Sequence, residues 1–287
     1  MRFGAELKRA LRPSVHRARL RRDALLGGNC LVLLYHRVIE LESDPQLLAV
    51  TPDRFDAQLA WLKKRCVMLT AEEFDSLLAS GKRFPRNSAL ITFDDGYADN
   101  HLHARPILER HGLQGLFFIS TGYIGSGREY WWDELERLLL LNTTLPQAVR
   151  WERHGLRLQW SERPADQVLR EHYELALELL RGIPSAARDS AMEELRALLN
   201  NPDARPSHLP MSIAELQVFA SSPAVALGAH TVGHPSLARI SAEEQRREFR
   251  ASKEQLEAWI GKPVTRFAYP FGTGADFSAT TLRIAEE

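Results

Sequence analysis

Two adjacent carboxylates, Asp94 and Asp95, are the residues best placed to do chemistry, because they follow an apolar run that ends at Phe93. Gly96 comes next and lets the chain turn. In parallel α/β folds the carboxyl ends of the strands open onto the ligand site, so a catalytic or metal-binding pair belongs here. A turn followed by a helix N-cap explains an Asp-Asp-Gly sequence equally well. The motif alone leaves both interpretations open.

A second polar cluster contains His230 and His234, four residues apart and just after another apolar run. On one helical turn this spacing points both imidazoles the same way. Two neutral imidazoles and one carboxylate form an open three-ligand zinc set, and Asp95 is the candidate for the carboxylate. A His-x-x-x-His pair also arises by chance, but its place at a strand end, with the aspartates at another, favours the metal site.

Two further apolar runs end in residues that suit a binding site. Tyr35 and His36 end one of them. The segment 267–272 ends the other, and its Pro270 forms a rigid turn that can aim a backbone N–H at a ligand. All four clusters thus fall at predicted strand ends.

These residue types together define a class of reaction. A divalent cation lowers the pKa of its bound water from about 15.7 to near 7 and polarises a carbonyl group. A spare carboxylate beside the cation acts as general base. The chain has no Ser or Cys motif paired with a base, so covalent catalysis lacks support. The sequence therefore predicts metal-assisted hydrolysis of an amide or an ester.

Strands and helices alternate along most of the chain, and this order must position the clusters. Uninterrupted apolar strands joined by helices predict a parallel sheet covered by helices, in a barrel or a doubly wound fold. Capping boxes are predicted at Thr70, Ser212 and Ser241, and helix ends at Gly81, Gly112 and Gly261. The predicted strands are 31–35, 67–69, 89–93, 116–119, 224–227 and 266–268.

The alternation fails between residues 125 and 210, which we interpret as a mostly helical insertion. Helical stretches are predicted at 133–141, 166–181 and 186–199, without a clear buried strand. A structural or lid-like insertion is favoured over a separate binding module. Tyr130, Trp131 and Trp132 stand at its edge, and we expect at least one exposed ring because three adjacent aromatics cannot all face one core. The predicted segments are 1–29 (basic), 30–124 and 211–287 (the main domain) and 125–210 (the insertion).

Composition and charge exclude several classes of protein. With 44% hydrophobic and 26% charged residues the chain is globular, and its formal net charge of zero indicates no nucleic-acid partner. Cys30 and Cys66 lie 36 residues apart, which argues against a zinc module or a disulfide scaffold and predicts two buried thiols. No signal peptide or membrane span is seen, which predicts a cytoplasmic location. Peripheral membrane contact through the basic segment 1–29 is kept as an alternative.

These motifs resemble those of the polysaccharide deacetylase family, also called NodB-homology or carbohydrate esterase family 4. The segment 92–96, Thr-Phe-Asp-Asp-Gly, resembles its first motif, and 230–235 fits His-Ser/Thr-x-x-His-Pro. The segment 269–272, Tyr-Pro-Phe-Gly, resembles part of its third motif. The resemblance covers about 31–123 and 224 to the end. It implies a distorted (β/α) barrel with the insertion looped out.

The resemblance also implies residue roles. Asp94 is expected as general base, while Asp95, His230 and His234 hold a divalent metal, with zinc expected and cobalt or nickel as alternatives. The backbone N–H of Phe271 is expected to share the developing oxyanion with the metal. Thr231 and Pro270 are expected to support the loops, and the carbohydrate-binding residues are expected to be Tyr35, His36, Tyr269, Trp131 and Trp132.

Two departures from the family pattern affect these expectations. The family often has an Arg two residues before the proline, whereas this chain has Ala268 there and Arg266 two positions earlier. The family's general acid is a His in a Leu-x-His motif on a late strand, and nothing after Gly272 matches it. We therefore expect a barrel that lacks its final strands and an activity impaired by the missing acid.

The leading hypothesis is a metal-dependent hydrolase that removes N-acetyl groups from amino sugars of a polysaccharide or lipid-linked saccharide. One alternative keeps the metal chemistry but hydrolyses another non-peptide C–N bond. The other is a degenerate carbohydrate-binding module without turnover, in which aromatic rings stack on sugar faces.

Overall fold

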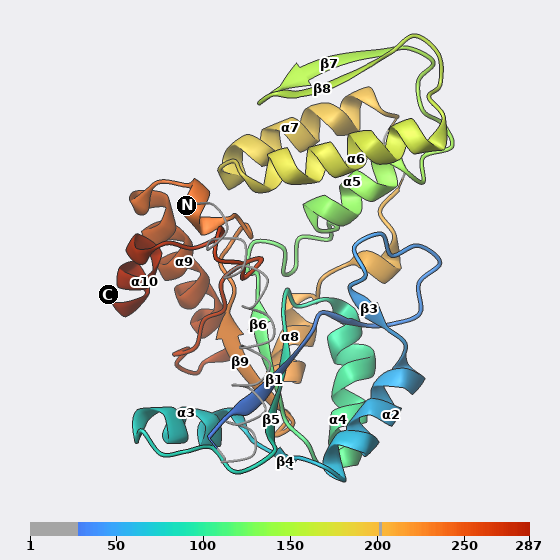
Figure 1. Ribbon diagram of the computed structural model, residues 1–287. Helices are drawn as coiled ribbons and strands as arrows, with labels where there is room; N and C mark the ends of the chain where they lie inside the picture. Colours follow the sequence, from blue (N-terminus) through green and yellow to red (C-terminus); the bar gives the residue numbers. More distant parts are fainter. Residues whose placement is uncertain (1–27, 201–202) are drawn as a thin grey trace, which may run out of the picture.

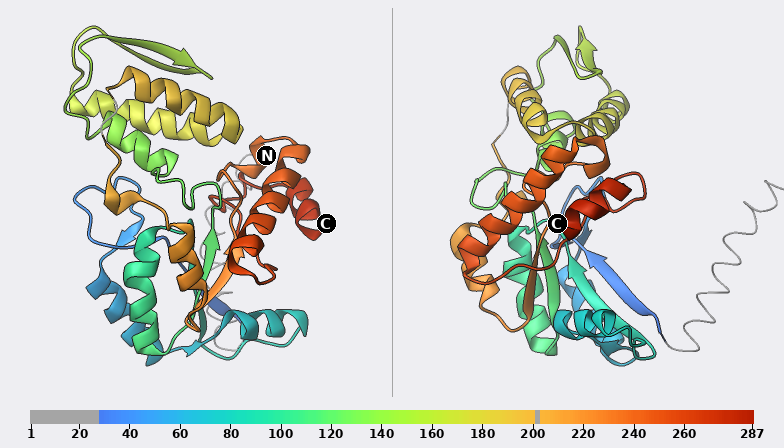
Figure 2. Two further views of the ribbon diagram at one scale, coloured as in Figure 1. Left: turned by 180° about the vertical axis from the view of Figure 1, so that it is seen from behind. Right: turned by 90° about the vertical axis from the view of Figure 1, so that its left-hand side faces the viewer.

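The computed structural model describes residues 28–200 and 203–287 and has two parts. The sheet part, residues 28–124 and 211–287, contains a parallel β-sheet and its helices, and the insertion comprises residues 125–210 (Figure 1). The insertion lies over the carboxyl ends of the strands, as the views in Figure 2 also show. Nearly all of the basic segment 1–29, with its predicted membrane contact, lies outside the described residues.

Five strands form the parallel sheet, which confirms the predicted α/β fold; closure into a barrel stays a prediction. The strand order is β1-β5-β6-β9, and β4 pairs with the beginning of β5. All six residues of β5 are buried, whereas Leu31, Val32 and Leu34 on the edge strand β1 are about half exposed. The bounds are β1 (Cys30–Tyr35), β4 (Val67–Met68), β5 (Ser88–Phe93), β6 (Gly115–Ile119) and β9 (Val225–Ala229).

Helices cover both faces of the sheet because successive side chains of a strand point to opposite faces. On one face Phe93 and Phe117 stack at 4.5 Å between ring centroids and pack among side chains of α2, α4, α8 and α9. On the other face Leu90 and Leu116 pack toward Phe74 of α3. The bounds are α2 (Pro52–Lys63), α3 (Ala71–Ala79), α4 (Arg105–His111), α8 (Ile213–Ala220) and α9 (Ala242–Ile260).

Local signals for the ends of helices are confirmed. Capping boxes form at the predicted Thr70, Ser212 and Ser241, and Gly112 and Gly261 end α4 and α9 in the left-handed conformation. The strand predicted at 266–268 is reduced to a single bridge between Phe267 and Ala229, because the chain turns away at Pro270. The remaining elements of the sheet part are β2 (Arg37–Val38), β3 (Ala49–Val50), the π-helix η1 (Asn100–Ala104), the 3₁₀ helix η3 (Leu237–Arg239) and α10 (Ala279–Glu286).

Three helices at the predicted positions form the apolar core of the insertion, which continues to Tyr97 and Tyr123 of the sheet part. Leu135, Leu139, Tyr173 and Leu195 are buried in it. The insertion also contains an antiparallel hairpin that the sequence pattern did not predict, with left-handed residues in its turn. The bounds are α5 (Trp131–Leu139), β7 (Val149–Arg153), β8 (Leu156–Trp160), α6 (Asp166–Arg181), α7 (Ser185–Leu198) and the 3₁₀ helix η2 (Pro206–His208).

The expectation of an exposed ring among the three adjacent aromatics is wrong. Tyr130, Trp131 and Trp132 are 0%, 3% and 3% exposed. All three rings belong to one apolar cluster together with Tyr97 and Tyr123, because the start of α5 lies where the insertion meets the sheet part and is enclosed on several sides. The Tyr130 hydroxyl donates to the carbonyl of Asp95, and the Trp132 indole donates to the Tyr97 hydroxyl.

The sequence predicts two buried thiols and no membrane-spanning helix. Cys30 and Cys66 are free thiols and are partly buried rather than fully buried as expected. Within the described ranges, every helix is too short or too polar to cross a bilayer.

Candidate metal site and active-site cleft

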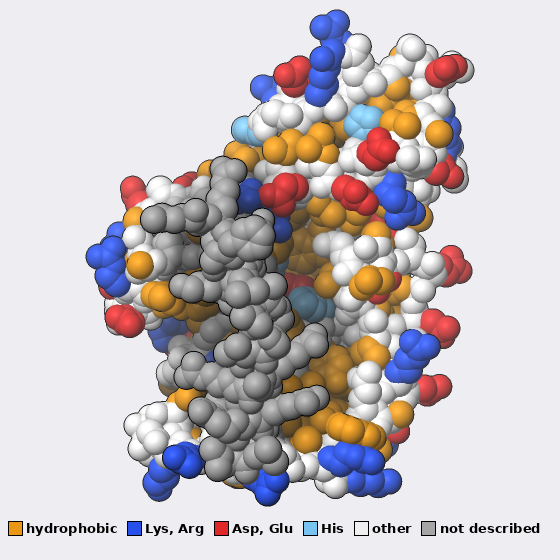
Figure 3. All heavy atoms as spheres, viewed as in Figure 1, with side chains coloured by type: hydrophobic (Ala, Val, Ile, Leu, Met, Phe, Trp, Pro, Cys, Tyr) orange, Lys and Arg blue, Asp and Glu red, His pale blue; other side chains and the backbone are white. Residues whose placement is uncertain are grey.

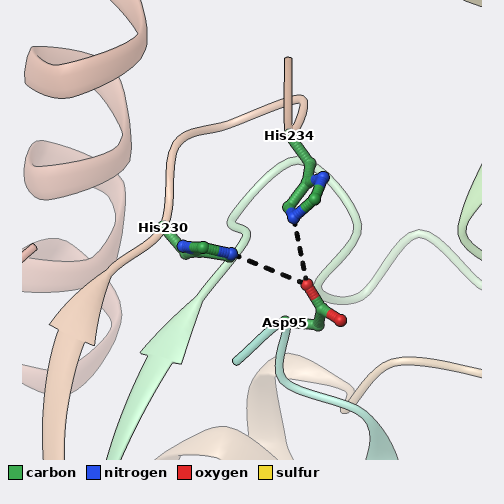
Figure 4. A group of neighbouring side chains, drawn as sticks. All are labelled: Asp95, His230 and His234. Atoms are coloured by element: carbon green, nitrogen blue, oxygen red, sulfur yellow. Dashed lines mark ion pairs between the residues drawn. The ribbon is translucent and has the colours of Figure 1, made fainter. Parts of the chain in front are cut away.

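The three predicted metal ligands come together at the carboxyl end of the sheet. Nε2 of His234 lies 3.4 Å from Oδ1 of Asp95, and Nε2 of His230 lies 3.8 Å from the same oxygen (Figure 4). All three side chains are buried. The fold therefore brings Asp95 together with two histidines that follow it by 135 and 139 positions in the sequence.

Parallel strands bring these residues to one edge of the sheet. Asp95 comes two residues after β5, and His230 directly follows β9. The N–H of His230 donates to the carbonyl of Ile119 at the end of the intervening β6, at 2.9 Å. This hydrogen bond holds His230 at the end of β6, at the same edge of the sheet as the aspartates.

The backbone at the site is unusually strained. Asp95, Thr231, His234 and Phe271 have φ angles of 76°, 66°, 56° and 64°, in the left-handed region that non-glycine residues rarely adopt. Such residues cost on the order of 1–3 kcal/mol each and persist where surrounding contacts hold them, typically at functional sites.

Burial keeps both imidazoles neutral, which leaves their lone pairs available to a metal ion. Burial lowers the pKa of His230 to about 4. Burial, with His230 and Arg188 nearby, lowers the pKa of His234 well below its usual value. Burial and the neighbouring Asp94 raise the pKa of Asp95 well above its usual value, so its carboxylate needs a positive charge beside it.

The donor set fits a divalent cation. Oδ1 of Asp95 is buried and has no hydrogen-bond partner among the described residues, although both imidazoles face it. Two ligands of one zinc ion, each bound at about 2.0–2.2 Å, stand at most about 4.4 Å apart, and both separations from Asp95 are shorter. Two neutral nitrogens and one carboxylate oxygen also match the ligand types of zinc sites with an open position.

The two histidines are oriented by different means. Nδ1 of His230 lies 2.9 Å from the carbonyl oxygen of Ala268, so Nδ1 carries the hydrogen and Nε2 is free to bind a metal. Nδ1 of His234 is buried without a partner among the described residues. Its ring lies instead among the rings of Trp132, Phe271 and His230, at centroid distances of 4.7, 4.7 and 4.8 Å.

Asp94 lies beside the cluster without belonging to it. Its Oδ2 is 3.9 Å from Nε2 of His230. Burial raises the pKa of Asp94 to about 6, while the nearby His36 lowers it. A carboxylate with such a pKa can accept a proton near neutral pH. Arg266 does not orient Asp94, because it pairs with Asp75 and Glu72 on α3.

The cluster lies at the bottom of a cleft with a volume of about 380 Å³ between the sheet part and the insertion. Figure 3 shows this hollow, with histidine and acidic side chains visible inside it and apolar side chains around it. Helix α6 forms the insertion's wall with Glu174, Leu177, Glu178 and Arg181. The predicted site residues that line the cleft are His36, Asp94, Asp95, Trp131, Trp132, His230, His234, Tyr269 and Phe271.

Tyr35 is the predicted site residue that the structure does not bring to the cleft. Its hydroxyl donates to Gln58, and its ring packs against Phe55 and Phe93 in the core of the sheet part. Strand alternation explains this placement, because adjacent residues such as Tyr35 and His36 point in opposite directions.

The two loop-supporting residues lie beside the ligands. The hydroxyl of Thr231 accepts from the N–H of His234 at 2.9 Å and donates to the carbonyl of His230. Pro270 accepts from the N–H of Gly272 at 2.8 Å and closes the turn that carries Phe271. The N–H of Phe271 donates to no acceptor within the described part of the chain, so it is available to a ligand.

A second group of potential ligands lies at the seam between the two parts, but it is already satisfied by protein groups. It consists of Asp133, Glu136 and His208. Tyr97 donates to Asp133 at 2.7 Å, and Arg205 pairs with Glu136 at 2.8 Å. The positive charge of Arg205 disfavours a cation here, and we assign no metal to this group.

Sequence reasoning missed two charged residues that hold the histidine loop. Arg188 on α7 donates to the carbonyls of Gly233 and His234, and Glu248 on α9 accepts from the N–H groups of Val232 and Gly233. Each lies on the buried face of an amphipathic helix. A charged residue at an apolar position is the signal that could have identified them.

Comparisons with known proteins agree with this geometry. The polysaccharide deacetylase family model matches residues 81–150 and 210–287, about half of the chain. A poly-beta-1,6-N-acetyl-D-glucosamine N-deacetylase of Staphylococcus aureus is 31% identical over 111 residues, 34% of this chain and 38% of that protein. YxkH of Bacillus subtilis is 34% identical over 95 residues, 33% of each chain. The matches thus span only about a third of these relatives.

Two solved structures share the fold. They are the deacetylase PplD of Streptococcus pyogenes, in complex with acetate, and IcaB of Ammonifex degensii. Each is 19% identical with a TM-score of 0.54, over 91% of this chain and 80% of the other.

Proposed function

Because this chain belongs to the polysaccharide deacetylase family, we propose that it is a metal-dependent hydrolase that removes N-acetyl groups from amino sugars of a polysaccharide or lipid-linked saccharide. The single observation that carries the proposal is the buried cluster of Asp95, His230 and His234 with Asp94 beside it, at the bottom of a cleft. Family membership supplies the substrate class, and the cluster supplies the chemistry.

The chain's own residues divide the work of hydrolysis. Asp95, His230 and His234 hold the cation, which when bound polarises the acetamide carbonyl and acidifies a water molecule. Asp94 stays off the cation and takes the proton from the attacking water on its carboxylate. The free N–H of Phe271 donates to the developing oxyanion, a contribution typically worth about 2.7–4 kcal/mol.

The residues around the cluster form the sugar site in this proposal. His36 and Tyr269 approach from the sheet part, and Trp131 and Trp132 approach from the insertion. The cleft is open on one side, as a site for a polymer must be. The N-acetylglucosamine polymer named for the staphylococcal relative is the first substrate to test.

Zinc is the proposed cation, with cobalt or nickel as alternatives that accept the same ligands. A cytoplasmic location stays a prediction of the sequence. The alternative of a carbohydrate-binding module without turnover rests on the missing acid motif and on the aromatic cluster, and glycan binding without acetate release would favour it.

Acetate release from N-acetylglucosamine oligosaccharides tests the proposal. The full chain is assayed with added zinc and after chelation, together with His234→Ala. The matched control is His103→Ala, which changes an exposed histidine outside the cleft. We expect acetate release to need the cation and His234 but not His103. Release that is indifferent to both chelation and His234→Ala would overturn the proposal.

A further inference from the structure

We propose that the insertion is a positioning element for the metal site, and that Arg188 of α7 sets the orientation of His234. This inference rests on the proposed function, because it takes His234 as a metal ligand. It goes beyond that function by giving the insertion a role in building the site, in addition to forming one wall of the cleft.

The need for such an element follows from the unequal support of the two histidines. His230 is held through its ring by the carbonyl of Ala268. The ring of His234 has no such hydrogen bond within the described residues, since its Nδ1 is unpartnered. The direction of its Nε2 therefore depends on the backbone of the loop 231–234 and on the rings packed around it.

Arg188 holds that backbone from the side of the insertion. Its guanidinium donates from Nη1 to the carbonyl of His234 and from Nη2 to the carbonyl of Gly233. Arg188 is fully buried, and its guanidinium lies 5.0 Å from the centre of the Trp131 ring. A buried guanidinium that binds two carbonyls is a rigid anchor, because its fork has a fixed geometry.

Glu248, on α9 of the sheet part, holds the same loop. Its Oε2 accepts from the N–H groups of Val232 and Gly233 at 2.7 and 3.0 Å. A cation thus holds the carbonyls of the loop, and an anion holds its N–H groups. Together they can maintain the left-handed conformation of His234, which is unfavourable by itself.

The approach of α7 to the loop leaves no room for a side chain at Gly233. A Cβ built there would lie 2.1 Å from Oγ of Ser185, at the start of α7. Trp132, on α5, packs against the ring of His234. The insertion therefore contacts this ligand through two of its helices, at the backbone and at the ring.

Cation affinity tests this inference without relying on turnover. Binding of Zn²⁺ and Co²⁺ to the full chain is measured by competition with a chelator, and the visible spectrum of bound Co²⁺ reports the ligand geometry. Arg188→Lys keeps the positive charge but loses the planar fork. Arg196→Lys is the matched control, because Arg196 lies on the same helix and pairs with Glu134 instead of the loop. Asp95→Asn shows whether the measured cation binding takes place at the proposed site.

We expect Arg188→Lys to weaken cation affinity about 10- to 100-fold, as loss of a group that orients a ligand does. The Co²⁺ spectrum should change as well, while Arg196→Lys behaves like the wild type. Thermal unfolding without metal shows whether Arg188→Lys is folded. If it is not, Trp132→Phe serves as the second variant, with a changed Co²⁺ spectrum expected.

The outcomes separate this inference from the function on which it rests. Loss of binding in Asp95→Asn, with wild-type affinity and spectrum in a folded Arg188→Lys, overturns the positioning role alone. Binding that survives Asp95→Asn overturns the metal site, and with it the proposed function.

Discussion

Helices of the sheet part and helices of the insertion begin differently. In the sheet part α2, α3, α8, α9 and α10 each start at a Ser or Thr whose side chain caps the helix, whereas α4 continues from η1 without a capping side chain. In the insertion α5, α6 and α7 start at Tyr130, Ala165 and Pro184, without a capping side chain. No side chain caps the first N–H groups of the insertion's helices. These helices therefore depend more on tertiary packing for their stability.

The two parts also differ in what they bring to the cleft. The sheet part supplies the titratable groups from loops with strained backbone, including Asp95 and His234. The insertion supplies side chains from regular helices, such as Trp132 and Arg181. The comparison suggests that the chemistry resides in the loops of the sheet part and that their geometry depends on packing against the insertion.

The sharpest test of this division is Asp94→Asn in the sheet part. We expect acetate release to fall by about 10²–10⁴, the usual contribution of a general base. Cation affinity should stay close to that of the wild type, because Asp94 is not among the proposed ligands. Asp53→Asn, on the exposed first turn of α2, is the control. Full activity in Asp94→Asn would contradict the assignment of the base.

The packing of the insertion is tested by Leu139→Ala. Leu139 is fully buried in the insertion's core, and a cavity of this kind lowers the free energy of unfolding by about 2–5 kcal/mol. Urea unfolding measures the loss, with the more exposed Leu141→Ala as control. If Leu139→Ala lowers the free energy of unfolding by less than Leu141→Ala does, the core of the insertion contributes little to stability.

The seam between the parts is tested by the pH dependence of stability. Tyr97 of the sheet part donates to Asp133 of the insertion, and burial raises the pKa of Asp133 from 3.8 to about 7. The folded state thus binds this proton more tightly, so stability present below pH 4 is lost as the pH rises to 7. Relative to Asp133→Asn, the wild type should lose at most about 1.4 kcal/mol per pH unit over this range.

Chemical unfolding at a series of pH values measures this difference. Parallel curves for the wild type and Asp133→Asn would show that Asp133 ionises as readily in the folded chain as in the unfolded chain.

The smallest expected effects concern the helix caps. Ser212→Ala removes a capping box in the sheet part and should lower the free energy of unfolding by about 1 kcal/mol. Ala165→Ser adds a capping hydroxyl where the backbone is already extended, and should raise it by a similar amount. Thermal unfolding detects both changes. If both variants raise the stability, or both lower it, the proposed difference in capping between the two parts is wrong.

Much of the fold was predictable because its signals are local. The apolar run before Asp94 predicted a buried strand, and Ser-x-x-Glu patterns predicted the starts of α8 and α9. The hairpin of the insertion escaped prediction. Its short strands are only partly buried and pair with each other rather than with the sheet.

The residues that carry the chemistry of the site were predictable, but the residues that hold them in position were not. Asp94, Asp95, His230 and His234 stood out because polar residues after apolar runs fall at strand ends. Arg188 gave a weaker signal, a charged residue at an apolar position of a helix that carries other charged residues. Its partners are 45 and 46 residues away, and only packing brings them together.

The sequence by itself determined the order of strands and helices, most helix ends, and the donors available for a cation, because hydrophobic periodicity, capping and side-chain chemistry act over a few residues. Tertiary structure alone decided that His36 faces the cleft while Tyr35 faces the core, and that three adjacent aromatic rings are all buried. It also decided which groups hold the loop of His234. These outcomes depend on which surfaces meet in three dimensions, and contacts between distant segments leave no local pattern in the chain.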